Sequence, residues 1–159
     1  MLAGQRLMLR HTLATLAYRG GKAVESAPVS FPALRIGERT RTPAQILAHI
    51  GDLLDWALHL AQGEHVWRDV PPLAWAADVE RFFAALAALD DYLASDRPLL
   101  GSAERLFQGP IADALTHVGQ LAMLRRLSGA PVRGENYAKA DIAVGQVGPA
   151  QTIPRVEFD

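Results

Sequence analysis

Apolar residues recur at helical spacing in four segments of the sequence, and this pattern restricts the fold more than any other feature. The segments cover residues 4–19, 43–62, 74–94 and 110–128. In each, the large apolar side chains fall three or four positions apart, which places them on one face of a helix. Alanine and leucine dominate these segments and β-branched residues are sparse, which favours helix over strand. We therefore expect an all-α protein.

Local start and stop signals bound these helices. Thr42 is a good N-cap, Pro43 suits the first helical position, and Gln45 completes a capping-box pattern. Gly20 and Gly21 predict the end of the first helix. A short helical turn is expected at 102–108, before the last helix begins at 110.

The remaining segments read as connectors and a tail within one domain, 1–159. Prolines at 28 and 32 predict an extended or irregular connector over 24–41. The tail, 132–159, is expected to be mostly irregular, with a little helix at 137–142. It should pack on the bundle through its apolar residues, which are Ile142, Val144, Ile153, Val156 and Phe158.

Composition excludes several classes of function. The chain has no cysteine, so disulfides, thiolate metal sites and cysteine nucleophiles are ruled out. The formal net charge is −1 and the arginines are scattered, so no basic patch points to nucleic acid. No apolar run approaches the roughly 20 residues that a membrane span needs. We expect a cytoplasmic protein that neither crosses a membrane nor binds nucleic acid.

Three polar side chains interrupt the apolar faces. Asp113 and His117 are four residues apart in the last helix, so they point the same way, and His49 lies at the edge of the apolar stripe of the 43–62 helix. Two imidazoles and a carboxylate can fill three positions on a divalent ion and leave others open. The spacing alone also fits an ordinary first-turn acid and a hydrogen-bonded histidine at the core edge.

Two segments resemble the DinB-like (YfiT-like) family, which is distinct from the DNA polymerase of the same name. They are TPAQILAHIGDLLDWAL and DALTHVGQLAMLRRLSGAPV. This resemblance implies a four-helix bundle of up-down-down-up topology. It also implies a divalent metal, often nickel or zinc, held by three histidines; manganese is a further candidate here. A low-molecular-weight thiol is a second cofactor that the resemblance suggests.

The resemblance assigns the site residues in one register. His49 matches the histidine of the second helix, and His117 matches the last histidine, because Gln120 then falls where the family has glutamine. Asp113 takes the place of the remaining histidine. The alternative register, with His117 as the first histidine of the pair, puts Leu121 at a ligand position that it cannot fill.

Other residues are weaker candidates for a pocket beside this site. Gln120 and Trp56 lie near the proposed ligands in the helical pattern, and His11 can face the same cavity from the first helix. Trp56 is also explained as a core residue, and His11 as an exposed or interface residue. Tyr137 lies in GENYAKADI, which resembles a segment that follows the last helix in relatives.

Two functions from different classes remain open. By the resemblance, the chain is a metal-dependent small-molecule enzyme, with thiol-dependent S-transferases and a maleylpyruvate isomerase among characterised relatives, and a transferase or hydrolase-like reaction. The alternative is a non-catalytic, dimeric bundle whose metal site has degenerated, as Asp113 in place of histidine suggests. A homodimer is expected in either case, because the first helix has two partly apolar sides.

Overall fold

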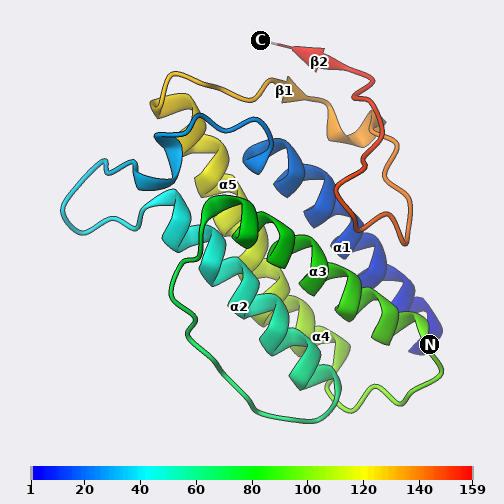
Figure 1. Ribbon diagram of the computed structural model, residues 1–159. Coiled ribbons are helices and arrows are strands. Elements are labelled where there is room, and N and C mark those ends of the chain that lie inside the picture. Colours follow the sequence, from blue (N-terminus) through cyan, green and yellow to red (C-terminus); the bar gives the residue numbers. More distant parts are fainter. Residues whose placement is uncertain (1, 159) are drawn as a thin grey trace.

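The long helices lie side by side around one apolar core (Figure 1). The structure is a computed structural model that describes residues 2–158, with the side chains of 3–158. Its elements are α1 (Leu2–Val24), η1 (Phe31–Ala33), α2 (Pro43–Ala61), α3 (Trp75–Ala94), α4 (Ala103–Leu106), η2 (Phe107–Ile111), α5 (Ala112–Leu127), β1 (Gly134–Glu135), η3 (Tyr137–Lys139) and β2 (Glu157–Phe158). This mostly helical architecture confirms the all-α prediction. Within the described residues, no helix combines the length and apolar character needed to cross a bilayer.

Helices α3 and α5 each pack against both α1 and α2. The start of α2 is fixed as its sequence predicts. The backbone N–H of Thr42 donates to Oε1 of Gln45 over 2.9 Å, and the N–H of Gln45 donates to Oγ1 of Thr42 over 3.3 Å. These two bonds satisfy backbone donors that a helix start leaves free. They also fix the place of His49 on α2, against α5.

The first helix does not end at its paired glycines, as the sequence predicted, but continues to Val24. A Cβ atom on Gly20 would lie 2.6 Å from Cζ of Phe82, whereas one on Gly21 would lie 3.6 Å from Cζ of Phe83. Gly20 therefore serves close packing of α1 on α3 rather than chain termination, and the apolar contact outweighs the low helix propensity of glycine.

The last long helix also begins differently from the prediction. The chain does not restart at Pro110 but passes from α4 through the π-type turn η2 directly into α5. Gly109 supplies the non-helical backbone in this turn, with φ −89° and ψ −106°, and Pro110 is buried within it. Because η2 packs against both α2 and α5, it joins the start of α5 to the helix that carries His49.

Two acids of α3, Asp78 and Asp90, are buried. Asp90 accepts two bonds from the Arg10 guanidinium, over 2.9 and 3.0 Å, and so ties α3 to α1. Asp78 accepts from the backbone N–H of Leu73 through Oδ2, while its Oδ1 has no partner. Their partners lie elsewhere in the chain, so the helical pattern of α3 alone did not reveal them.

Arg125, near the end of α5, is also buried rather than solvated. Its Nη1 donates to the carbonyl oxygens of Ala23 and Glu25, and its Nε donates to that of Ala130. Burial lowers the pKa of this guanidinium, but the carbonyl oxygens satisfy its donors. Arg125 thus fastens the end of α1 to the end of α5.

The tail packs on α1 through a buried acid more than through its predicted apolar anchors. Glu135 accepts from the Tyr18 hydroxyl over 2.7 Å and from Nζ of Lys22 over 2.9 Å. β1 and β2 pair antiparallel, with Glu135 opposite Glu157. Val147 is buried, but Ile153, predicted as an anchor, is 87% exposed. Val156 and Phe158 are exposed as well.

The connection between α2 and α3, residues 62–74, runs back along the outside of α2 from the end of that helix to the start of α3 (Figure 1). It carries Trp67, whose ring packs edge-on against Trp56 of α2 at a centroid distance of 5.7 Å. This contact brings a loop residue against the same face of α2 that presents His49.

Candidate metal site

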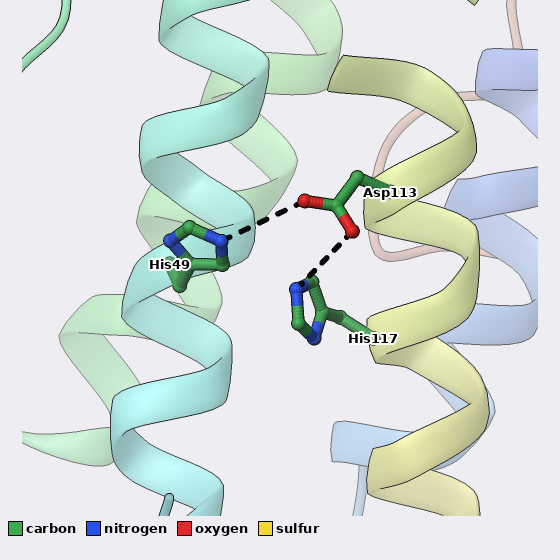
Figure 2. A group of neighbouring side chains, drawn as sticks. All are labelled: His49, Asp113 and His117. Carbon is green, nitrogen blue, oxygen red and sulfur yellow. Dashed lines mark ion pairs between the residues drawn. The ribbon is translucent and has the colours of Figure 1, made fainter. Parts of the chain in front are cut away.

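His49 of α2 and the Asp113–His117 pair of α5 point toward one another between the two helices (Figure 2). Nε2 of His49 lies 3.8 Å from Oδ2 of Asp113, and Nε2 of His117 lies 3.5 Å from Oδ1 of the same carboxylate. The two imidazole rings meet edge to face, with centroids 4.9 Å apart. The i, i+4 spacing on α5 and the packing of α2 on α5 together create this group.

The geometry and chemistry of these donors fit a divalent metal. One ligand atom from each residue can be chosen so that all three lie within 4.8 Å of one another. Ligands bonded to a zinc-like ion at about 2.1 Å are separated by roughly 3.3 Å, so small side-chain rotations suffice to enclose an ion. Two imidazoles with one carboxylate form a donor set that zinc, nickel or manganese accept. The group can therefore hold a metal ion.

The site is closed on the histidine side and open on the carboxylate side. The side chains of His49 and His117 are 17% and 11% exposed, whereas that of Asp113 is 49% exposed. Thr116 donates its hydroxyl hydrogen to the backbone carbonyl of Asp113 over 2.7 Å. An ion held here has room for further ligands from solvent or from a substrate.

His117 is oriented by a second contact on its other nitrogen. Nδ1 lies 2.8 Å from Oε1 of Gln120, one helical turn further along α5. With Nδ1–H as the donor, Nε2 keeps its lone pair and faces Asp113. Hydrogen bonds of this kind fix the tautomer and ring orientation of metal-binding histidines. Gln120, selected from the sequence as a pocket residue, thus lies directly behind a proposed ligand.

The pKa of His49 is lowered from its ordinary value, first by burial and then by the positive charge of Arg41 and by His117. Asp113 and Asp52 oppose this shift. The lowered pKa favours the neutral imidazole near pH 7, and this is the form that binds a metal.

Aromatic side chains cover one side of His49. Its ring packs edge-on against Trp67 at a centroid distance of 5.8 Å. Trp56, which the sequence suggested as a pocket wall, contacts Trp67 and so lies one ring further out. Trp67 itself was not predicted beside the site, because nothing in the local sequence fixes the path of the 62–74 loop.

Two other candidates are placed elsewhere. His11 is an exposed residue of α1 and does not line the cavities beside the group. Tyr137 packs edge-on against Tyr18 of α1 at 6.2 Å, and the Arg19 guanidinium stacks over its ring at 4.3 Å. Tyr137 thus belongs to the contact between the tail and α1.

A cavity of about 570 Å³ opens beside His117, and a smaller hollow of about 280 Å³ lies beside His49. Arg41, immediately before the N-cap of α2, lines both. Arg41 was not predicted as a site residue, although it is a basic residue that adjoins a well-defined helix start. The larger cavity is lined by Ile36, Thr40, Arg41, Ile46, Thr116, His117, Gly119, Gln120, Met123 and Leu124.

Neither protein-family models, nor curated proteins, nor solved structures gave a match to this chain. The fold and the site therefore define its class by themselves. It is a mostly helical protein in which His49, Asp113 and His117 form a group that can hold a metal ion beside a cavity of ligand size.

Proposed function

We propose that this chain is a divalent-metal-dependent enzyme for small molecules, with His49, Asp113 and His117 as the metal ligands. The observation that carries the proposal is the convergence of these donors, from two helices, to within 4.8 Å of one another. Metal sites built from facing helices of a bundle use this arrangement. The adjoining cavity has the volume expected for a small-molecule site.

We also propose that the chain belongs to the DinB-like family and has its up-down-down-up topology. Support comes from the resemblance of the segments that contain His49 and His117. The long return of residues 62–74 along α2 is further support, because two successive helices that run in the same direction need such a connection (Figure 1). Asp113 in place of the family's histidine is the main departure.

Each residue has a definite role in this proposal. His49 and His117 bind through neutral nitrogens, Asp113 supplies negative charge, and Gln120 holds the His117 ring. A divalent ion bound there supplies Lewis-acid polarisation and lowers the pKa of a water or thiol that it binds. The chain contains no cysteine, so the thiol of an S-transferase reaction must come from a low-molecular-weight cofactor.

Metal titration of the full chain, purified without a histidine tag and stripped with a chelator, tests the site. Nickel, zinc and manganese are added separately and binding is followed by calorimetry. We expect one ion per chain and a higher unfolding temperature, because an ion that binds only the native state stabilises it. The His49→Ala/His117→Ala variant should lose both effects.

The matched control is His11→Ala/His65→Ala, which removes two exposed histidines outside the group. It should bind metal as the unchanged chain does. Metal-free protein whose stability does not respond to any of the three ions contradicts the proposal and favours the non-catalytic bundle. Equal losses in the two double variants would place the metal at adventitious histidines.

A separate assay tests whether the chain catalyses the transfer of a thiol to an electrophile. The metal-loaded chain is incubated with a chromogenic electrophile and, in turn, with several low-molecular-weight thiols. We expect at least one thiol to react faster than in buffer containing the same metal, and His49→Ala/His117→Ala to abolish the difference. Ester hydrolysis without a thiol tests the hydrolase-like alternative in the same format.

A further inference from the structure

The 570 Å³ cavity beside His117 has an apolar side that solvent reaches. Ile36 and Met123 both line it, although 52% and 54% of their surfaces are exposed. Ile46 and Leu124, which are buried, form its inner part. Exposed apolar side chains that flank a cavity with a buried apolar floor favour an organic ligand over a fully hydrated ion.

The lining of this cavity contains a basic residue and no acid. Arg41 is the only charged side chain that lines it, apart from the titratable His117, and no Asp or Glu does. Among residues 2–158, the side chain of Arg41 forms no hydrogen bond or ion pair. The second hollow, beside His49, contains Asp52 and Asp69, but Asp52 is bound to Arg81 over 2.6 Å and Asp69 makes no ion pair with Arg41.

The position of Arg41 is fixed by its neighbour. Thr42 caps α2 through two hydrogen bonds, so the backbone at Arg41 is held at the start of that helix. Arg41 lines both hollows, one of them together with His117 and the other together with His49. A ligand anion on Arg41 therefore stands beside His49 and His117.

We propose that the cavity binds a small organic carboxylate with an apolar body. The carboxylate pairs with the Arg41 guanidinium, whose planar fork matches it, and the body lies against Ile36 and Met123. The lining offers one guanidinium and no second lysine or arginine, which matches the single charge of a carboxylate. This inference rests on the proposed function, since it names the substrate class that the metal-binding group would act on.

The test uses metal-free full chain and two probes of nearly the same shape, 4-phenylbutyrate and the neutral 4-phenylbutyramide. Binding is followed by amide chemical shifts in nuclear magnetic resonance spectra. We expect the carboxylate to bind more tightly than the amide and to shift the resonances of Arg41 and of 116–124. Acetate, which lacks the apolar body, should bind much more weakly than 4-phenylbutyrate.

Two exposed arginines of one loop supply the variant and its control. Arg41→Gln should weaken 4-phenylbutyrate binding by about tenfold, as expected for a charge-assisted pair at an accessible site, and leave the amide unaffected. Arg39→Gln, from the same loop but outside the cavity lining, should leave both unchanged. Equal affinity for the two probes, equal effects of the two variants, or no binding overturns the inference.

Loss of metal ligands distinguishes a failure of the carboxylate site from a failure of the metal site. The same titration in His49→Ala/Asp113→Ala, which removes two proposed metal ligands and no residue of the cavity lining, should still show the carboxylate preference, because it depends on Arg41. A carboxylate that binds only after metal addition, and does so equally in Arg41→Gln, ligates the metal instead. That result overturns the carboxylate subsite on Arg41 while keeping the metal site.

Discussion

The contact between His117 and Gln120 should increase the affinity of the site for a metal ion. Without the Gln120 acceptor, the imidazole is free to rotate and to exchange tautomers, so its Nε2 is less often presented to the ion. We expect Gln120→Ala to raise the metal dissociation constant by about tenfold. Competition with a chelating dye measures this change.

The variant Gln120→Glu provides the counterpart, since its carboxylate can still accept from Nδ1–H. It should bind metal at least as tightly as the unchanged chain. If Gln120→Ala and Gln120→Glu have the same affinity as the unchanged chain, the contact does not act on the metal ligand.

Asp78 should make stability depend on pH with a predictable sign. Burial raises its pKa above the ordinary value of 3.8, against the opposing effects of the Leu73 N–H and the Arg81 charge. The native state therefore binds this proton more tightly than the unfolded chain does. The resulting stabilisation is fully present below pH 3.8 and is lost as the pH rises through the higher native pKa.

Asp78→Asn does not titrate, so its free energy of unfolding relative to the unchanged chain should increase over that interval. Urea unfolding at several values from about pH 3.5 to about pH 7 tests the sign. Asp91→Asn, at an exposed position of the same helix, is the control. A relative stability of Asp78→Asn that falls with rising pH contradicts the assignment.

The sequence allowed single residues to be placed where helix geometry fixes the direction in which their side chains point. Asp113 and His117 could be placed together because their spacing is local, and His49 because it interrupts an apolar stripe. Arg41 and Trp67 could not be placed, because they lie in connecting segments whose paths depend on distant contacts. Asp90 is buried by Arg10, 80 positions away, and no local pattern encodes such a partner.

Within helix α1, alanine substitutions at the two adjacent glycines should differ in their effect on stability. Gly20→Ala puts a methyl group against Phe82, which is buried and cannot move aside, so we expect a loss of about 1–3 kcal/mol in stability. Gly21→Ala makes only ordinary contacts and gains helix propensity, so it should be neutral or up to about 1 kcal/mol more stable.

Chemical denaturation of the two variants measures this difference, and each is the other's control. If both variants are destabilised alike, the loss of stability arises from the backbone at the two glycines rather than from the contact of Gly20 with Phe82.

Helix starts were predictable to the extent that they are local. The cap at Thr42 needs only three following residues, and the structure contains it. The start of α5 is different, since Gly109-Pro110 reads as a break in sequence. Contacts of η2 with α2 and α5 hold that turn in a π-type continuation, and this cannot be inferred without knowing the packing.

At the scale of the whole molecule, we propose that α1 mediates a homodimer. Leu7 and Met8 expose 56% and 67% of their surfaces on α1, and His11 is exposed on the same helix. Sedimentation at micromolar concentration should give a dimer, and Met8→Glu should shift it toward monomer, because a charge then replaces apolar contact area. A monomer for the unchanged chain contradicts this prediction.

The helical character of the molecule followed from its apolar periodicity, but the packing of its tail did not. Hydrophobicity selected Ile153 as an anchor, whereas the acidic Glu135 is buried against α1. A carboxylate tolerates this burial only because Tyr18 and Lys22 both donate to it, and that pairing depends on the assembled fold.

We propose that His49, Asp113 and His117 bind one divalent ion, and anomalous diffraction from metal-loaded crystals is the sharpest test of that binding. Data collected at the absorption edge of the added metal locate the ion without reference to the protein. We predict one peak per chain at about 2.0–2.2 Å from Nε2 of both histidines and from a carboxylate oxygen of Asp113. A peak bonded to other residues, or no peak between α2 and α5 at saturating metal, contradicts the claim.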